Sequence, residues 1–358
     1  MVIYLINKIF YAILTLFGVV TVIFFLFNVL PGDPAQMMLG QNEDSGQLAI
    51  VKQKYGFDKP IGTQYLYYLN DLSPISFHST KMEDYTYLRE GKYTDTKLFT
   101  IGTTTTVIKF PYLRESFTKQ GKKVSQIIAE TLPNTFVLAV FAICIAIAIG
   151  IFLGIISALF KDKWIDKFIQ VVSTLGMSVP SFFSAILFAW FFGFVLHEYT
   201  NLEMTGSLYE LDDYGEAMHI QWKNLILPAI VLGIRPLAVV IQLMRNSLLE
   251  VFNQDYIRTA RAKGLNEFQI IRKHAVKNAL NPVVTAISGW FASMLAGAVF
   301  VEYIFGWNGL GKEIVNALNT LDLPVIMGAV LIIALIFIII NIFVDVIYVW
   351  LDPKVKLQ

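Results

Sequence analysis

The 358-residue sequence predicts an all-α polytopic membrane protein with six transmembrane helices and a larger extracytoplasmic loop region. Hydrophobic residues make up 56% of the chain and charged residues only 15%, against roughly 25% charged in an average soluble domain. A globular fold of this length would have to bury an improbable amount of apolar surface, whereas a bilayer accommodates it. The apolar residues also form six long runs, and Lys and Arg gather in alternate loops.

Each run is long enough to cross a bilayer as a helix, because about 20 helical residues span its apolar core. Lipid offers no hydrogen-bond partner to the backbone, so each spanning segment is expected to be helical. The fourth run contains one charge, Arg235. Pro180, Pro228 and Pro236 lie within or near the runs, where proline tends to kink helices. The six predicted spans are residues 9–30, 134–160, 168–196, 224–244, 283–301 and 323–344.

Small residues recur at four-residue spacing in two of the predicted spans. Gly150 and Gly154 form such a pair in the second span, and Gly289, Ser293 and Gly297 repeat the spacing in the fifth. This pattern lets helix backbones approach closely. Glycine is also common in membrane helices without a packing role, and this alternative explains the pattern about as well.

The distribution of Lys and Arg predicts the orientation of the spans. Positive charges favour cytoplasmic loops, and here they concentrate at 161–167, at 245–277 and near both chain ends. The opposite short loops carry only Lys223 and Lys312. Both termini are therefore predicted to be cytoplasmic, and the long segment 31–133 extracytoplasmic.

These predictions divide the chain into four parts. The external part contains a polar and aromatic stretch, 74–111, with the run KLFTIGTTTTVIKF. Its Thr, Val, Ile and Phe residues favour strands, so a small β-rich insertion is predicted there. The four parts are an N-terminal transmembrane helix 1–30, an extracytoplasmic region 31–133, a transmembrane core 134–350 with a cytoplasmic loop 246–282, and a cytoplasmic tail 351–358.

The cytoplasmic loop 246–282 is too patterned for a spacer. Apolar residues from Tyr256 to Leu265 recur at helical spacing among basic residues, and Gly264 ends the run. Such a short amphipathic helix suits a lipid surface or a groove on a soluble partner. Small residues at Thr259, Ala260 and Ala262 favour the groove, which could close tightly over the backbone. The simpler alternative is a basic loop that only sets topology.

At this point the sequence resembles a known family. The segments YIRTARAKGL and HAVKNALNPVVT look like the coupling segment of binding-protein-dependent ABC importers, in the version typical of oligopeptide, dipeptide and nickel permeases. Further motifs occur in the order typical of the first, B-type permease subunit of these importers. They are PGDPA at 31–35, GFDKPIGTQYLYYL at 56–69, TLPNT at 131–135, SVPSFF at 178–183, NQDYIRTARAKGL at 253–265, FGWNGLGKEI at 305–314 and LDPKVKL at 351–357.

The resemblance implies a type I ABC importer permease in a bacterial cytoplasmic membrane, moving peptides inward. It implies as partners a second homologous permease, two cytoplasmic ATPases, an extracytoplasmic solute-binding protein and membrane lipid. This chain would hold no cofactor, since ATP and magnesium would bind the ATPases. Insertion 74–111 would contact the solute-binding protein or cap the external vestibule. The ATPase-coupling residues it implies are Asp255, Tyr256, Arg258, Thr259, Ala260, Arg261, Ala262, Lys263, Gly264 and Leu265.

Several other site types are disfavoured. The stretch GWNGLGKE at 306–313 spaces Gly306, Gly311 and Lys312 like a phosphate-binding loop, but Glu313 replaces the hydroxyl residue that would hold magnesium. A tight turn or gate is the better interpretation. The four histidines are scattered, without the spacing of a metal site. We also expect no catalytic residues and no nucleic-acid binding.

Alternatives to peptide import remain open at this point. Import of nickel or another chelated metal is the nearest one. An ion-driven secondary transporter would need acidic or histidine relays inside the spans, which the six runs lack. A non-transporting scaffold or enzyme is disfavoured, because the sequence indicates no set of residues that would converge on one site. Arg235 is the candidate pathway residue, because a charge at mid-span should face a cavity, a substrate carboxylate or a counter-charge.

Overall fold

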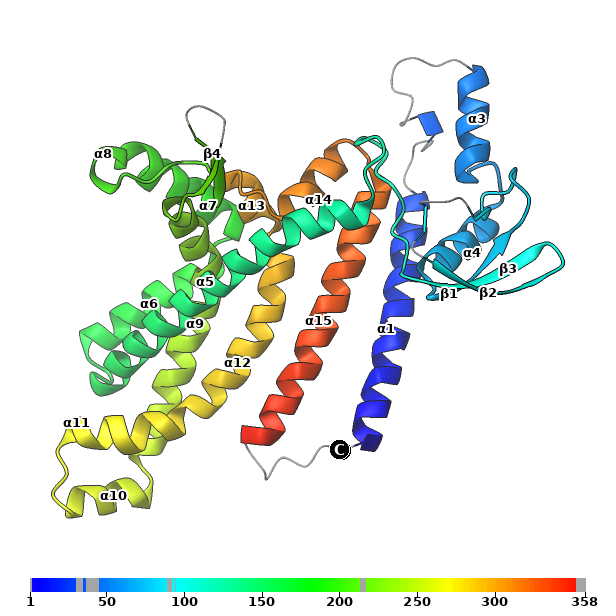
Figure 1. The fold of residues 1–358 in the computed structure, drawn as a ribbon. Helices are drawn as coiled ribbons and strands as arrows, with labels where there is room; N and C mark the ends of the chain where they lie inside the picture. Colours follow the sequence, from blue (N-terminus) through cyan, green and yellow to red (C-terminus); the bar gives the residue numbers. More distant parts are fainter. Residues whose placement is uncertain are drawn as a thin grey trace. The chain divides into compact units, whose positions relative to one another are not determined.

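The computed structural model describes residues 2–29, 35–36, 45–88, 92–93, 95–212 and 217–351 (Figure 1). The predicted tail lies outside the described residues from position 352 onward. Contacts divide the chain into two compact units, described separately below. The first consists of residues 1–9, 131–315 and 335–358, and the second of 10–130 and 316–334.

Within the described residues, five helices are long and apolar enough to cross a membrane, or six spans if one bent pair counts as one. This confirms the predicted helical membrane fold. The long helices are α1 (Val2–Val29), α5 (Val124–Leu159), α9 (Lys223–Phe252), α12 (Val276–Gly297) and α15 (Leu323–Leu351). The bent pair is α6 (Trp164–Ser178) and α7 (Ser181–Trp190), followed by the π-helical turn η1 (Phe191–Val195).

The predicted span 168–196 is broken into two helices at Pro180, one of the three prolines expected to kink helices. The helices α6 and α7 meet at a bend of 108°. Val179 and Pro180 both adopt extended backbone angles at the bend, because proline disfavours a helical conformation in the residue before it. Pro228 and Pro236, in contrast, lie inside α9 without interrupting it.

Helix α9 contacts α6, α7 and α12 in the first unit. Gly150 and Gly154 of α5 lie against it: a Cβ atom on Gly150 would lie 2.6 Å from Val240, and one on Gly154 would lie 2.7 Å from Met244. The glycine pair predicted for close approach is therefore a real contact of α5 with α9. Gly289 and Gly297 of α12 have no atom within 4 Å of such a Cβ.

The loops of the first unit contain short elements. One loop carries a small antiparallel hairpin, which the sequence analysis missed, and another folds into two short helices. These elements are α8 (His197–Thr200), β4 (Tyr209–Leu211), β5 (Met218–Ile220), α13 (Val299–Phe305) and α14 (Leu310–Asn319).

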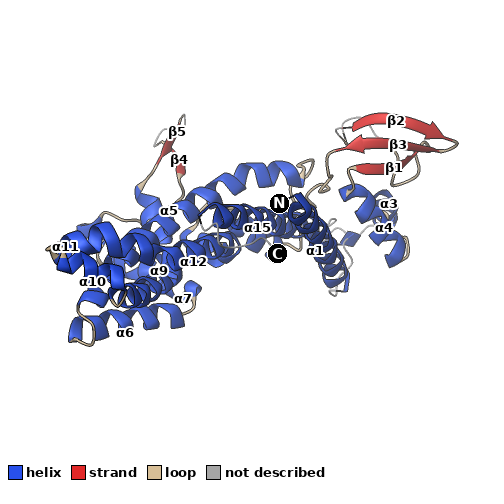
Figure 2. Ribbon diagram, turned by 90° about the horizontal axis from the view of Figure 1, so that it is seen from below, coloured by secondary structure: helices blue, strands red, loops and turns tan. Residues whose placement is uncertain are grey.

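The second unit contains the predicted β-rich insertion. Its three antiparallel strands have the order β1-β3-β2 (Figure 2), and the hairpin β2–β3 coincides with the alternating run noted in the sequence. Helix α4 packs beside β1. Phe24 of α1 stacks on Tyr68 of α4, with ring centres 5.6 Å apart. The elements are α3 (Ser45–Tyr55), α4 (Ile61–Leu72), β1 (Ile75–Ser79), β2 (Asp95–Ile101) and β3 (Thr104–Lys109).

Candidate functional site

The loop between α9 and α12 forms the amphipathic helix that the sequence predicts. This helix, α10, runs from Asp255 to Ala262. Ile257 is fully buried and Ala260 is 5% exposed. Both belong to a hydrophobic cluster with Leu248 of α9 and Ile270 of the following helix, so the loop has its own core and is held against the membrane helices.

The opposite face of α10 is exposed. The side chains of Asp255 and Arg258 are 96% and 73% accessible, and Tyr256 is 42% exposed. Thr259, Arg261, Ala262, Lys263 and Gly264 are also exposed, while Leu265 is partly buried against the cluster. Ala260 was expected among the small residues available to a groove, but it is buried inside the loop in this chain and supports the exposed face.

A defined turn fixes the end of α10. Gly264 has φ +79°, a left-handed conformation that side chains other than glycine rarely adopt. Its N–H donates to the carbonyl of Arg261 at 2.9 Å, and the N–H of Leu265 donates to that of Ala260 at 3.3 Å, a pattern typical of helix ends. The next helix begins at once, because Asn266 and Gln269 form a reciprocal cap. The segment continues through α11 (Glu267–Ile270) and the π-helical turn η2 (Ile271–Ala275) into α12.

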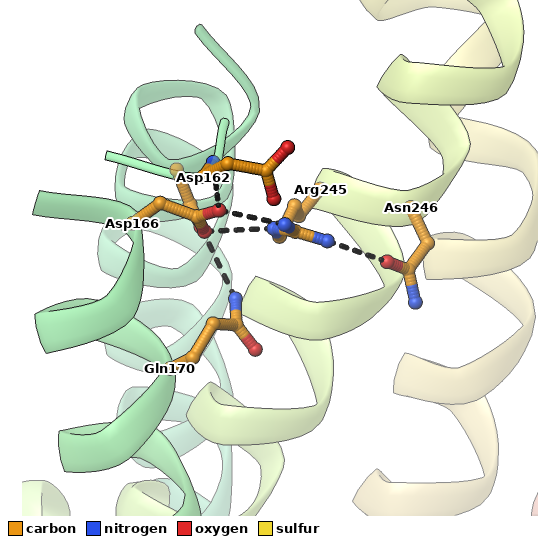
Figure 3. Close-up of polar contacts among 6 residues, drawn as sticks. Asp162, Asp166, Gln170, Arg245 and Asn246 are labelled. Carbon is orange, nitrogen blue, oxygen red and sulfur yellow. Dashed lines mark hydrogen bonds and ion pairs between the residues drawn. The ribbon is translucent and has the colours of Figure 1, made fainter. Parts of the chain in front are cut away.

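A buried ion pair lies on the N-terminal side of α10, near the C-terminal end of α9. Arg245 donates from Nε and Nη2 to the two carboxylate oxygens of Asp166 in α6, at 2.8 and 2.6 Å (Figure 3). The Ser157 hydroxyl of α5 and the backbone N–H of Asp162 also donate to this carboxylate. The Asp166 side chain is 3% exposed and that of Arg245 18%. Three helices are thus held together where α9 leads into the loop that contains α10.

Arg235, the candidate pathway residue, is exposed on α9 in this single chain. It makes no hydrogen bond or ion pair with any residue that the structure describes. It borders a cavity of about 80 Å³ together with Ser181, Ser293 and Gly297. Two of the three small residues noted in the fifth span, Ser293 and Gly297, therefore line the same cavity as Arg235.

The stretch that imitates a phosphate-binding loop holds a carboxylate of the chain itself. Glu302 of α13 is completely buried, and its Oε2 accepts hydrogen bonds from the N–H groups of Gly311 (2.7 Å) and Lys312 (3.2 Å). These donors lie at the start of α14, where a helix favours negative charge. Burial nevertheless raises the pKa of Glu302 to about 7, and its Oε1 has no hydrogen-bond partner among the described residues.

The glycines of this stretch have structural roles. Gly306 ends α13 in a left-handed conformation with φ +68°. A Cβ on Gly311 would lie 2.5 Å from the backbone of Val299. The ammonium group of Lys312 donates to the carbonyl of Gly306 (3.0 Å) and to Asn308 (2.8 Å). The stretch is therefore a tight turn, as the sequence favoured. No cluster of three or more metal-ligating side chains occurs in the described ranges.

Sequence reasoning missed Asp166, Arg245 and Glu302. Arg245 was counted only among the positive charges that set topology. Asp166 offered a signal, since it is an acidic residue near Lys161, Lys163 and Lys167 at the start of an apolar run. Nothing in the sequence pairs it with a residue 79 positions away.

Comparisons with known proteins agree with this architecture. The family model for the binding-protein-dependent transport system inner membrane component matches residues 150–357, and a model for the N-terminal part of such components matches residues 1–81. The chain is 32% identical to the dipeptide transport system permease protein DppB of Alkalihalophilus pseudofirmus, covering 99% of both chains. It is 28% identical to the probable D,D-dipeptide transport system permease protein DdpB of Escherichia coli, covering 96% of this chain and 94% of the relative.

Among solved structures, an inward-facing conformation of the MetNI methionine ABC transporter shares the fold. The TM-score is 0.51 at 15% sequence identity, over 63% of this chain and 97% of the compared chain. The apolar helices and the ordered loop between α9 and α12 are thus embedded in a known architecture. The chain belongs to the family of binding-protein-dependent transport system inner membrane components, the multi-pass permease subunits of ABC importers, and it is not an enzyme.

Proposed function

We propose that this chain is one of two permease subunits of an ATP-driven peptide importer and that residues 253–265 couple it to a cytoplasmic ATPase. The observation that carries the proposal is the structure of α10. Its buried residues Ile257 and Ala260 fasten it to the membrane helices, while Arg258 and its neighbours remain exposed. A helix held in this way can transmit a rigid-body movement of a docked protein into the spans.

The orientation follows from the same loop. Positive charges around 161–167 and 245–277 favour a cytoplasmic location for this side of the membrane, and we assign both termini to the same side. Coupling to an ATPase requires α10 to be on that side. The segment 31–133, including insertion 74–111, is then extracytoplasmic and available to the solute-binding protein or as a cap over the vestibule.

The complete importer that we propose contains further components besides this chain. These are a second homologous permease, two ATPases that bind ATP and magnesium, a solute-binding protein, and surrounding lipid. Arg235 is assigned to the pathway or to the contact with the second permease, because it borders a cavity and has no partner among the described residues. Peptides are favoured over nickel because the relatives reported above are named for dipeptides.

Site-specific crosslinking tests the coupling proposal. The single native cysteine, Cys144, is replaced by serine, and Ala262→Cys is introduced into the exposed face of α10. We expect a short bifunctional thiol reagent to link residue 262 to an ATPase carrying surface cysteines in the purified complex. The matched control, Met218→Cys, is also exposed, at 72% in β5, but it is predicted to lie outside the cell.

Two outcomes would contradict the proposal. The first is a complex that retains both ATPases while residue 262 reacts with free reagent but never with an ATPase. The second concerns energy: uptake of a radiolabelled dipeptide into proteoliposomes should require ATP. Uptake driven by an ion gradient in the absence of ATP would instead identify a secondary transporter.

A further inference from the structure

The second unit, residues 10–130 and 316–334, contains a cavity of about 660 Å³. Small-molecule sites typically measure about 300–1,000 Å³. Aromatic rings from three separate segments line it, among them Tyr55, Phe57, Tyr85 and Phe117. Tyr55, Phe57 and Phe117 contact one another, with ring centres 6.0 Å apart for the pair Phe57–Phe117, while Tyr85 stacks on Tyr67. The cavity therefore has a built aromatic wall.

Arg114 brings a positive charge to this wall and is held in place from behind. Its Nε donates to Asp71 at 3.0 Å, and Asp71 is only 1% exposed. The Tyr85 hydroxyl donates to the same carboxylate at 2.7 Å, and the guanidinium lies 5.3 Å from the ring centre of Tyr68. Arg114 also has φ +68°, a strained backbone conformation of the kind that clusters at functional sites.

The terminal amino groups of Arg114 are not used within the described part of the chain, since its hydrogen bonding there is confined to Nε. A guanidinium fixed through Nε presents these remaining donors in a fork that matches a carboxylate. Lys92 adds a second positive charge to the lining, with its ammonium 4.4 Å from the ring centre of Tyr85. The site is thus prepared for an anionic group beside an apolar body.

The lining also contains the carboxylates of Glu83, Asp84 and Glu115. Charges of both signs around an aromatic cavity suit a zwitterion with side chains, which is the chemistry of a short peptide. A segment of a docked protein would instead need a broad complementary surface, since stable protein interfaces bury about 800 Å² on each partner. The cavity volume of about 660 Å³ favours the small ligand.

We propose that this cavity binds a short peptide, with the peptide α-carboxylate on Arg114, its ammonium group near Glu115 or Glu83, and its side chains against the aromatic wall. The inference rests on the proposed function, because it takes the transported peptide as its ligand. It adds a binding site in the permease itself, distinct from the solute-binding protein.

Isothermal titration of the purified complex of both permeases and ATPases, without solute-binding protein, tests the proposal. The probes are the dipeptide Leu-Phe, its C-terminal amide and its N-acetyl derivative. We expect saturable binding of Leu-Phe and a loss of about tenfold or more for the amide, because a hydrogen-bonded charge pair is removed. The N-acetyl derivative should bind more weakly as well.

Three variants assign the binding to the cavity. Arg114→Lys should lose the preference for the free carboxylate. Because Arg114 also holds Asp71, Phe117→Ala and Glu115→Gln provide independent tests that leave this pair intact, and each should weaken binding severalfold. The matched control is Phe110→Ala, since Phe110 is 78% exposed and does not line the cavity; it should bind as the wild type does.

Equal binding of dipeptide and amide, or wild-type affinity in both Phe117→Ala and Glu115→Gln, would overturn the proposal. So would a complex that binds no dipeptide but binds the solute-binding protein in a manner that depends on Glu115 and Phe117. ATP-dependent uptake by the complete wild-type system distinguishes failure of this inference from failure of the proposed function. Uptake without cavity binding rejects only this inference, whereas absence of uptake rejects the proposed function.

Discussion

Removing the carboxylate of Asp166 should destabilise the first unit and loosen the support of the loop between α9 and α12, the loop that we propose couples to an ATPase. The carboxylate accepts two hydrogen bonds from Arg245, at 2.8 and 2.6 Å, and further ones from Ser157 and Asp162. The Arg245 side chain is 18% exposed in the native packing, and in Asp166→Ala its guanidinium has lost its counter-charge. Breaking a buried pair on one side costs about 3–5 kcal/mol.

The expected value lies at the lower end, about 3 kcal/mol, because Arg245 retains some access to water and a bond to Asn246 at 3.3 Å. Asp166→Asn should cost less, since an amide oxygen can still accept hydrogen bonds. Lys167→Ala, the matched control, changes an exposed neighbouring charge and should stay within about 0.5 kcal/mol.

A double-mutant cycle measures the pair. The stability of the purified complex in detergent is followed during denaturant titration for Asp166→Ala, Arg245→Ala and the double variant. The double variant should be clearly less destabilised than the sum of the single ones. Additivity to within about 0.5 kcal/mol would show that the two side chains are not coupled and would refute the reasoning.

The functional consequence is tested in the same proteins. Because the pair ties α6 to α9 just before the coupling loop, the single variants should hydrolyse ATP with less peptide transported per ATP. An apolar double replacement, Asp166→Leu with Arg245→Met, restores packing without charge and is expected to recover stability. Full recovery of coupling in that variant would show that the pair acts through stability alone.

Three further predictions follow from the turn after α10, the buried carboxylate and the glycine contacts. Gly264→Ala should cost about 1–2 kcal/mol, because φ is +79° while a Cβ meets no atom within 4 Å. Gly264→Pro also removes the N–H bonded to Arg261 and should uncouple ATP hydrolysis from uptake, and normal uptake in that variant would contradict the proposed coupling through residues 253–265. Glu302 has a pKa raised from 4.5 to about 7 by burial, so the folded state retains a proton that the unfolded chain releases; stability should be greatest below pH 4.5 and fall by on the order of 3 kcal/mol as the pH rises through 7. Glu302→Gln should abolish this pH dependence in thermal unfolding, and an unchanged profile would assign it to other groups. Gly154→Leu should destabilise by about 1–3 kcal/mol through overpacking against Met244, whereas Gly289→Ala, with open space around it, should be neutral or slightly stabilising, and equal unfolding midpoints for the two variants would contradict the contact.

The membrane helices were predictable because the bilayer imposes one simple length rule on apolar runs. Their continuity was not. Pro180, Pro228 and Pro236 look alike in the sequence, yet only Pro180 interrupts a helix. A helix can accommodate proline where neighbouring helices and local adjustments satisfy the freed backbone groups. That condition depends on tertiary packing, which the sequence of an apolar run does not show.

The coupling loop shows the same division between local and distant information. The helix over Asp255–Ala262 and the special role of Gly264 follow from spacing and from one glycine, and both are found. Local spacing did not show which face turns inward, so Ala260 was assigned to a partner although it packs inside the loop. The orientation of a short helix is decided by residues such as Leu248 and Ile270, which come from other elements.

Glu302 shows why a motif needs its surroundings before it can be read as chemistry. Gly306, Gly311 and Lys312 have the spacing of a phosphate-binding loop, and the backbone N–H groups of Gly311 and Lys312 do bind an anionic group. The carboxyl group of Glu302, in the preceding helix of the same chain, accepts these hydrogen bonds, so the two donors are already occupied. The physical principle behind the motif, donors at a helix start that attract negative charge, therefore holds here, while the nucleotide that it usually predicts is replaced by a structural carboxylate. The same reasoning gives Arg114 its interest: it is a fixed cation whose terminal donors lack a carboxylate from the described chain, so a ligand is the natural source of one.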